Sequence, residues 1–196
     1  MTLHTKIAAD RSFVIREGTA EDAAVLRRVF EEASHGLAQY FWDISLAGET
    51  DRDRAILDRM SRRIADPATR FRVCEICGVP AGGVLSYEKD ETPEDPGDCG
   101  PLMRALIEAE NDLTGTHYIN ALAVFPEFRR RGIARALIED VAAGAWQPLS
   151  LIAADVNADA LRLYDATGFE TVRRHPMAKE GWDGAGEAWL SMTRRG

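Results

Sequence analysis

The chain has 196 residues, of which 45% are hydrophobic and 29% charged, and its formal net charge is −8. A chain of this length can bury a full apolar core, and we expect a single domain over residues 1–196. The composition is too apolar for a disordered chain and too poor in glycine and proline for a fibrous protein. The acidic balance also excludes bulk affinity for nucleic acid, so the three consecutive arginines Arg129, Arg130 and Arg131 are an exception in this sequence.

Neither a signal peptide nor a membrane span is predicted. The first residues, MTLHTKIAADRSF, contain no continuous apolar stretch of the length that a signal peptide needs. The longest uncharged run, from Val141 to Ala154, contains Gln147 and Pro148 and is shorter than the roughly 18 apolar residues of a membrane span. We therefore expect a soluble, cytoplasmic protein with no membrane partner.

Cys74 and Cys77 form a CxxC pair, which is compatible with a metal site, a redox site or ordinary packing. A zinc site would need a second pair of ligands at comparable spacing, and the rest of the sequence offers only Cys99 and four scattered histidines. Residues 72–76 alternate in polarity as a strand does, and residues three apart on a strand point to opposite faces. We interpret the two cysteines as packing residues and expect no metal.

The first half of the chain predicts two helices and three strands. The strands are expected at 13–16, 71–77 and 83–87, and the helices at 19–33 and 54–64. Thr19 is the predicted N-cap of the first helix, and Gly78-Val79-Pro80 is the predicted connection of a hairpin. The aromatic segment Gly36 to Trp42 shows no clear period, so no regular element is predicted there. Residues 90–100 are expected to form an acidic surface loop.

The second half alternates strands and helices. Strands are expected at 118–125, 149–154, 169–173 and 188–192, and helices at 102–110, from residue 132 onward, and at 158–166. Together with the hairpin, this alternation predicts the α/β class, with a mixed central β-sheet and helices on both faces.

The turn that contains the three arginines has the pattern of an anion site. It lies between the apolar strand 118–125 and the start of a helix, where unpaired backbone N–H groups and the helix dipole favour negative charge. Gly132 removes a Cβ where a phosphate would approach the backbone, and the arginines add positive charge. The alternative is a solvated basic turn. Neither GxGxxG nor GxxxxGK[ST] occurs, and one arginine run does not make a basic face, so we expect no nucleic-acid partner.

Arg129-x-x-Gly132-x-Ala134 resembles the acyl-CoA-binding signature (Q/R)xxGx(G/A) of the GCN5-related N-acetyltransferases, the GNAT superfamily. A second block, from Leu149 through Asn157 and Tyr164 to Phe169, is similar to the strand, helix and strand that follow this signature in the family. The resemblance is specific from about His117 to Arg173, and it implies a cofactor-binding core at about 117–175.

The resemblance implies an acetyl-CoA-dependent acyltransferase that acts on a primary amine of a small molecule or a peptide. The backbone of Leu122, Ala123 and Val124 would pair with the pantetheine arm. Asn157 would bond to the same arm, and Tyr164 would protonate the departing thiolate. The pyrophosphate would be held by Arg129, Arg130, Arg131, Gly132, Ile133 and Ala134. The alternatives are a plain N-cap for Asn157 and a packing role for Tyr164.

The sequence departs from the family in its general base. Many relatives carry a glutamate on this strand, whereas here the segment reads His117-Tyr118-Ile119-Asn120, and Asn120 cannot take a proton at neutral pH. Asn120 could position a water or the acceptor amine, while His117, Glu88 or a water chain takes the proton. Without a dedicated base, the protein could instead be a non-catalytic acyl-CoA-binding or regulatory module.

Aromatic residues are the candidates for the acceptor pocket. Tyr40 and Trp42 follow the first predicted helix, where the family builds a substrate wall, and Tyr87 ends a predicted strand. The alternative for these aromatic side chains is packing in the core. A homodimer is compatible with the resemblance.

Overall fold

The computed structural model describes residues 13–195 and shows a mixed α/β fold. Its seven strands follow the hydrogen-bonding order β1-β2-β3-β4-β5-β7-β6, with antiparallel and parallel pairs, which confirms the predicted class. The described residues divide into two compact units, 13–86 with 121–143, and 87–120 with 144–195. The single domain expected from length stays a prediction.

The first unit holds the N-terminal elements and the segment that follows the middle of β4. Its elements are β1 (Val14–Glu17), the 3₁₀ turn η1 (Ala20–Asp22), α1 (Ala23–Ala33), α2 (Leu37–Ser45), α3 (Arg52–Ala65), β2 (Thr69–Ile76), most of β3 (Val79–Glu88), the second half of β4 (His117–Val124), the 3₁₀ turn η2 (Pro126–Phe128) and α5 (Ile133–Gly144) without its last residue.

The second unit holds the C-terminal end of β3 and the first half of β4. Its complete elements are α4 (Pro101–Asn111), β5 (Leu149–Ala154), α6 (Ala158–Ala166), β6 (Glu170–Pro176) and β7 (Ala188–Arg194). In this unit β4 and β5 run parallel over three residue pairs, ending at Ile119↔Leu151, and β7 pairs antiparallel with both β5 and β6.

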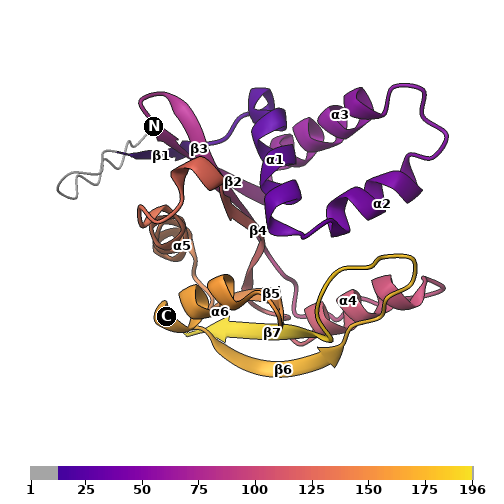
Figure 1. The fold of residues 1–196 in the computed structure, drawn as a ribbon. Helices are drawn as coiled ribbons and strands as arrows, with labels where there is room; N and C mark the ends of the chain where they lie inside the picture. Colours follow the sequence, from indigo (N-terminus) through magenta and orange to yellow (C-terminus); the bar gives the residue numbers. More distant parts are fainter. Residues whose placement is uncertain (1–12, 196) are drawn as a thin grey trace. The chain divides into compact units, whose positions relative to one another are not determined.

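In the first unit, helices cover both faces of the strands. Phe71 and Val73 of β2 belong to the core that α1, α2 and α3 cover, and Leu26 of α1 is fully buried there. Successive strand residues point to opposite faces, so Arg72 points the other way. Its Nε lies 2.7 Å from the Asp140 carboxylate of α5, which therefore lies on the opposite side of these strands from α1 (Figure 1).

A glycine allows β3 to approach β4 closely. A Cβ on Gly82 would lie 2.3 Å from the carbonyl oxygen of Ala123 and 2.9 Å from the Cα of Val124, and both of these are backbone atoms. Beside it, the N–H of Phe125 donates to the carbonyl of Ala81 over 2.9 Å. The position of the C-terminal half of β4 is thus set directly by the backbone of β3.

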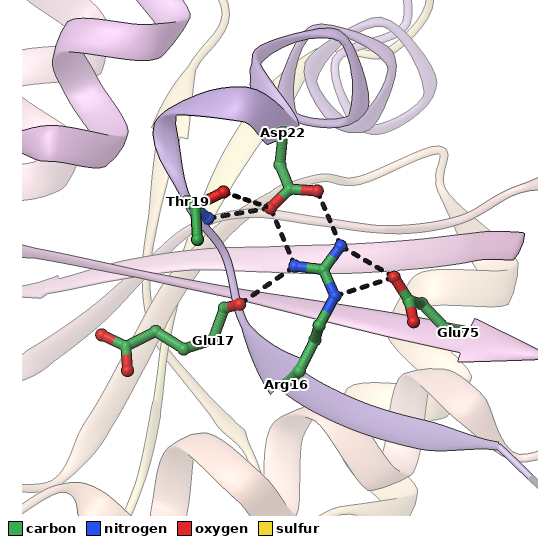
Figure 2. Close-up of polar contacts among 5 residues, drawn as sticks. All are labelled: Arg16, Glu17, Thr19, Asp22 and Glu75. Atoms are coloured by element: carbon green, nitrogen blue, oxygen red, sulfur yellow. Dashed lines mark hydrogen bonds and ion pairs between the residues drawn. The ribbon is translucent and has the colours of Figure 1, made fainter. Parts of the chain in front are cut away.

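A charged network joins β1, η1 and β2 (Figure 2). Arg16 of β1 reaches the carboxylate of Asp22 over 2.7 Å and that of Glu75 in β2 over 2.7 Å. The other oxygen of Asp22 accepts the backbone N–H of Thr19 at 2.8 Å, which caps the first turn. The hydrogen bonds from Arg16 hold the pKa of the buried Asp22 below its usual value.

In the second unit, polar contacts attach α4 to its neighbours. Ser191 of β7 donates its hydroxyl to the carbonyl of Ala109 over 2.9 Å, and Asp112 at the C-terminal end of α4 lies 2.6 Å from the His175 ring of β6. Lys89 and Glu110 form an ion pair of 2.9 Å. The residues between β3 and α4 have no regular structure, as the acidic composition of 90–100 predicts.

The main error of the sequence prediction is that it expects no regular element from Gly36 to Trp42. Gly36 is the N-cap of α2, and the residues after it form most of that helix. The buried residues of this helix region, Ala38, Trp42 and Leu46, lie four residues apart. That helical stripe extends beyond the short window in which no period was visible. The hairpin also turns one residue earlier than predicted, at Cys77-Gly78, where φ is 51° and 76°.

The structure confirms a packing role for Cys74 but not for Cys77. Cys74 is fully buried on β2 and Cys77 is exposed in the turn, and burial raises the pKa of Cys74 to about 12. Over residues 13–195, no three His, Cys, Asp or Glu side chains gather as a metal site would require. None of the helices described is both long enough and apolar enough to cross a membrane. The signal-peptide expectation concerns residues 1–12, which lie outside the described residues.

Candidate active site

The turn between η2 and α5 has the backbone geometry of an anion site. Arg130 and Gly132 both adopt left-handed conformations, with φ of 65° and 79°, on either side of Arg131. Such alternation turns successive backbone N–H groups toward one side, and the first N–H groups of α5 begin immediately afterwards at Ile133. Residues 129–132 are exposed, while Ile133 is 1% exposed and anchors the helix start. The turn therefore presents directional donors that suit a pyrophosphate.

Arg129 points away from this turn. Its Nε donates to the carbonyl of Val124 over 3.0 Å, and its Nη2 donates to Glu32 of α1 over 2.8 Å. The Arg131 guanidinium lies 5.8 Å from the centroid of the Phe128 ring. The sequence predicts that these arginines contribute to phosphate binding, and the structure shows that the side chain of Arg129 is engaged with β4 and α1 instead.

The backbone of β4 alternates in the direction of its polar groups. The N–H of Phe125 bonds to β3, so the backbone of Ala123 faces β3 as well, in the alternation of an antiparallel pair. The N–H and C=O groups of Leu122 and Val124 point away from β3. Of the three residues predicted to pair with an extended cofactor arm, Leu122 and Val124 thus have the suitable backbone orientation.

In the second unit, Tyr164 lies half-buried on α6 with its ring centroid 5.7 Å from that of Phe169. Burial raises the pKa of Tyr164 to about 12, so the phenol keeps its proton at neutral pH. Asn157 is the N-cap of α6, and its Oδ1 accepts the N–H of Ala160 at 3.3 Å. A bond from this side chain to a cofactor would come from the amide nitrogen.

Tyr118 lies among the candidate site residues, and sequence reasoning did not single it out. It is buried on β4, its hydroxyl shares a hydrogen bond with Asn120, and its ring centroid lies 5.4 Å from that of Tyr87. Burial first, and then the charge of Glu110, raise the pKa of Tyr118 well above its usual value. Tyr118 is therefore a hydrogen-bond donor at neutral pH rather than a base. The period of two that puts residues 118 and 120 on one strand face was the available signal.

Tyr118 brings several predicted residues together within the second unit. Tyr87 and Tyr164 are both near enough to act electrostatically on its hydroxyl, and Asn120 bonds to it directly. The other groups considered as proton acceptors lie differently, because His117 is 1% exposed and Glu88 is exposed at the end of β3.

The aromatic residues proposed for the acceptor pocket have different environments. Trp42 is 5% exposed and packs in the core of the first unit, as the packing alternative predicts. Tyr40 keeps part of its surface exposed and meets Phe41 edge to face at 5.6 Å. Tyr87 is also half-buried but belongs to the second unit.

Comparison with known proteins identifies the family and the fold. The family model "Acetyltransferase (GNAT) family" matches residues 34–169. No curated protein matches significantly. Among solved structures, an acetyltransferase from Thermus thermophilus is 19% identical with a TM-score of 0.57, and the match covers 94% of this chain and 97% of that chain.

Two further structures were solved with ligands. Arabidopsis thaliana NAA60, in complex with a bisubstrate analogue, is 15% identical over 93% of this chain and 97% of that chain, with a TM-score of 0.61. The PaiA N-acetyltransferase from Thermoplasma acidophilum, in complex with coenzyme A, is 14% identical over 94% of this chain and 100% of that chain, with a TM-score of 0.56. These likenesses concern the fold, and the family match spans most of the sequence. The chain belongs to the GNAT family of acetyltransferases.

Proposed function

We propose that this protein transfers an acetyl group from acetyl-CoA to a primary amine of a small molecule or a peptide. The observation that carries the proposal is the turn at residues 129–132, where two left-handed residues precede the N-terminus of α5. GNAT enzymes use acetyl-CoA, and this backbone geometry suits the pyrophosphate of that cosubstrate.

In this proposal the donor is held mainly by backbone groups. The N–H groups from Arg131 to Ile133 bind the pyrophosphate, and the backbone of Leu122 and Val124 bonds to the amides of the pantetheine arm. Asn157 adds a side-chain donor. Backbone recognition of this kind is rigid before the ligand arrives, so little ordering entropy opposes binding.

The proposed chemistry is direct attack on the thioester. The amine nitrogen forms a bond to the acetyl carbon, the C–S bond breaks, and CoA leaves as a thiolate. One proton leaves the amine and one is taken up by the sulfur, so the reaction is balanced. Tyr164, whose pKa is about 12, donates a hydrogen bond to the sulfur as negative charge develops there. Asn120, bonded to Tyr118, orients the acceptor amine.

Charge supports a cationic acceptor. Residues 88–112 contain nine acidic and two basic residues, so this one segment contains almost all of the chain's net charge of −8. Seven of the nine carboxylates, at Glu88, Asp90, Glu91, Glu94, Asp95, Asp98 and Glu108, are on exposed residues. Such a field raises the encounter rate of cations and is screened by salt.

The test is release of CoA thiol from acetyl-CoA in the presence of an amine panel. We expect turnover that is faster with cationic than with neutral amines at low salt, and a loss of that preference at high salt. In Tyr164→Phe we expect kcat to fall about 100-fold, the size expected for a lost hydrogen-bond donor to the developing charge, while acetyl-CoA affinity is kept. A preference for neutral or acidic amines would reject the cationic acceptor.

The second candidate is a non-catalytic acyl-CoA-binding or regulatory module. The observation that favours it is the absence of a carboxylate from β4, whose sequence is HYINALAV. This candidate predicts that acetyl-CoA at about 100 times its Kd stabilises the fold by about 2.7 kcal/mol while no amine is acetylated. Turnover by the wild type that falls in Tyr164→Phe would exclude this candidate. A wild-type protein that neither binds acetyl-CoA nor acetylates any amine would reject both candidates.

A further inference from the structure

The first arginine of the signature makes contacts that connect three elements of the first unit. Arg129 bridges the carbonyl of Val124, at the end of β4, and the carboxylate of Glu32 on α1, with distances of 3.0 Å and 2.8 Å. The hydrogen bond to Val124 closes the chain back on itself across η2. Arg129 is thus fixed at both ends of its guanidinium while its backbone begins the anion-binding turn.

A second contact from α1 holds the same segment. Arg28, one helical turn before Glu32, forms a bidentate pair with Glu127 at 2.9 Å and 3.0 Å. Its guanidinium carbon lies 3.9 Å from the centroid of the Phe125 ring. Glu127 within η2 and Arg129 directly after it are therefore both anchored to one face of α1.

We propose that Arg129 and Glu32 are positioning residues that brace the anion-binding turn, and that Arg129 is not itself a phosphate ligand. The proposal deepens the proposed function and rests on it for its effect on acetyl-CoA. A left-handed conformation at a non-glycine residue such as Arg130 persists only where surrounding contacts impose it. The bonds of the preceding residue, Arg129, to Val124 and Glu32 are contacts of that kind.

The brace also gives a physical reason for the glutamine or arginine at the first position of the signature. Both side chains carry an N–H donor that can reach back to a carbonyl five residues earlier. Arginine adds a second donor and a charge, which here bind Glu32. A phosphate ligand, by contrast, would gain nothing from an uncharged glutamine beyond one hydrogen bond.

The two roles predict opposite results for Glu32→Gln. This change removes a negative charge next to a site for a polyanion and releases Arg129, so a phosphate-binding Arg129 would tighten acetyl-CoA binding or leave it unchanged. If Arg129 is a brace, loss of Glu32 loosens the turn and weakens binding. We expect the Kd of acetyl-CoA to rise about three-fold in Glu32→Gln, the size expected for a partly exposed ion pair.

The matched control is Glu31→Gln. Glu31 lies next to Glu32 on α1 and pairs with Arg27 at 2.8 Å, so the variant makes the same charge change without touching the turn. We expect no change in Kd. Arg129→Ala should weaken binding about ten-fold through loss of a charged hydrogen bond, and Arg129→Gln should recover part of that loss by donating to Val124. Calorimetry should show these changes in Kd, and steady-state kinetics should show them in KM, with kcat at saturation unchanged.

Amide hydrogen exchange without ligand tests the brace independently of acetyl-CoA. Exchange at the hydrogen-bonded amides around the turn, those of Phe128, Arg129 and Ala136, should be about three-fold faster in Glu32→Gln than in Glu31→Gln, since a lost partly exposed ion pair lowers the cost of local opening by that factor. Equal exchange in the two variants, or tighter acetyl-CoA binding in Glu32→Gln, would overturn the proposal. If exchange responds but the wild type binds no acetyl-CoA, the brace stands and the proposed function fails.

Discussion

At the scale of single residues, Asp22 shows how a buried charge is stabilised in this fold. Its carboxylate accepts from Arg16 and from the N–H of Thr19, and Arg16 also binds Glu75 on the neighbouring strand (Figure 2). Removing one member leaves buried polar groups unsatisfied, which costs more than a surface ion pair does. The network fixes the start of the first helical region to β1 and β2.

We predict that Asp22→Asn lowers the free energy of unfolding by about 2 kcal/mol at pH 7. Because the folded-state pKa of Asp22 is depressed, its contribution is present above the unfolded-state pKa of about 3.9 and is lost as the pH falls through the folded-state value. Denaturant unfolding at several pH values checks this, with Glu17→Gln as control because Glu17 is exposed on the same strand. If the difference between wild type and Asp22→Asn does not shrink at all as the pH is lowered from 7 to far below the unfolded-state pKa, this explanation is contradicted.

The direction of the Arg129 side chain is a residue-scale feature that the sequence could not predict. The signature identifies the position, but the partner Glu32 lies 97 residues away in sequence. The environment of Tyr118 could not be predicted from the sequence either, because Glu110 and Tyr164, which raise its pKa, belong to other elements. Contacts of this range depend on the folded backbone and leave no local pattern.

At the scale of elements, prediction succeeded where a pattern is local and complete. The strand at Leu149–Ala154 and the helix at Ala158–Ala166 have the bounds that the sequence predicts, because an apolar run and a helical stripe with its N-cap define them. The helix α2 was missed because its buried residues, Ala38 and Trp42, extend to Leu46 outside the aromatic segment. The packing of Trp42 in the core follows from the same helix.

The conformation of the anion-binding turn gives an element-scale prediction. Gly132 has a φ of 79°, a region that costs an L-residue roughly 1–2 kcal/mol, so we expect Gly132→Ala to lower the free energy of unfolding by about 1 kcal/mol. We also expect its Kd for acetyl-CoA to rise about ten-fold, since the donors of the turn are displaced by this strain. Denaturant unfolding and calorimetry measure the two effects.

Gly48→Ala is the matched control for this change. Gly48 lies in the exposed turn after α2, does not need a positive φ, and has no atom within 4 Å of the position a Cβ would take. We expect neither stability nor affinity to change appreciably. Equal effects of the two substitutions would show that the backbone of the turn does not bind the donor.

At the scale of the whole molecule, the proposed function assigns donor and acceptor recognition to segments of opposite charge. The basic turn at residues 129–131 suits a polyanionic donor, while the acidic segment at 88–112 accounts for almost all of the net charge of −8 and favours a cationic acceptor. This contrast in charge can be counted from the sequence, because it depends on composition alone. The family and the fold class were predicted as well, because two motif blocks at a fixed spacing identify them.

The central claim is that the turn at residues 129–132 and the start of α5 bind the pyrophosphate of acetyl-CoA. A crystal structure of the protein with CoA tests it most directly. We predict hydrogen bonds of about 2.9 Å from the backbone N–H groups of this turn to the pyrophosphate, with Arg129 still bonded to Val124 and Glu32. Density for CoA with its pyrophosphate elsewhere on the protein would contradict the account.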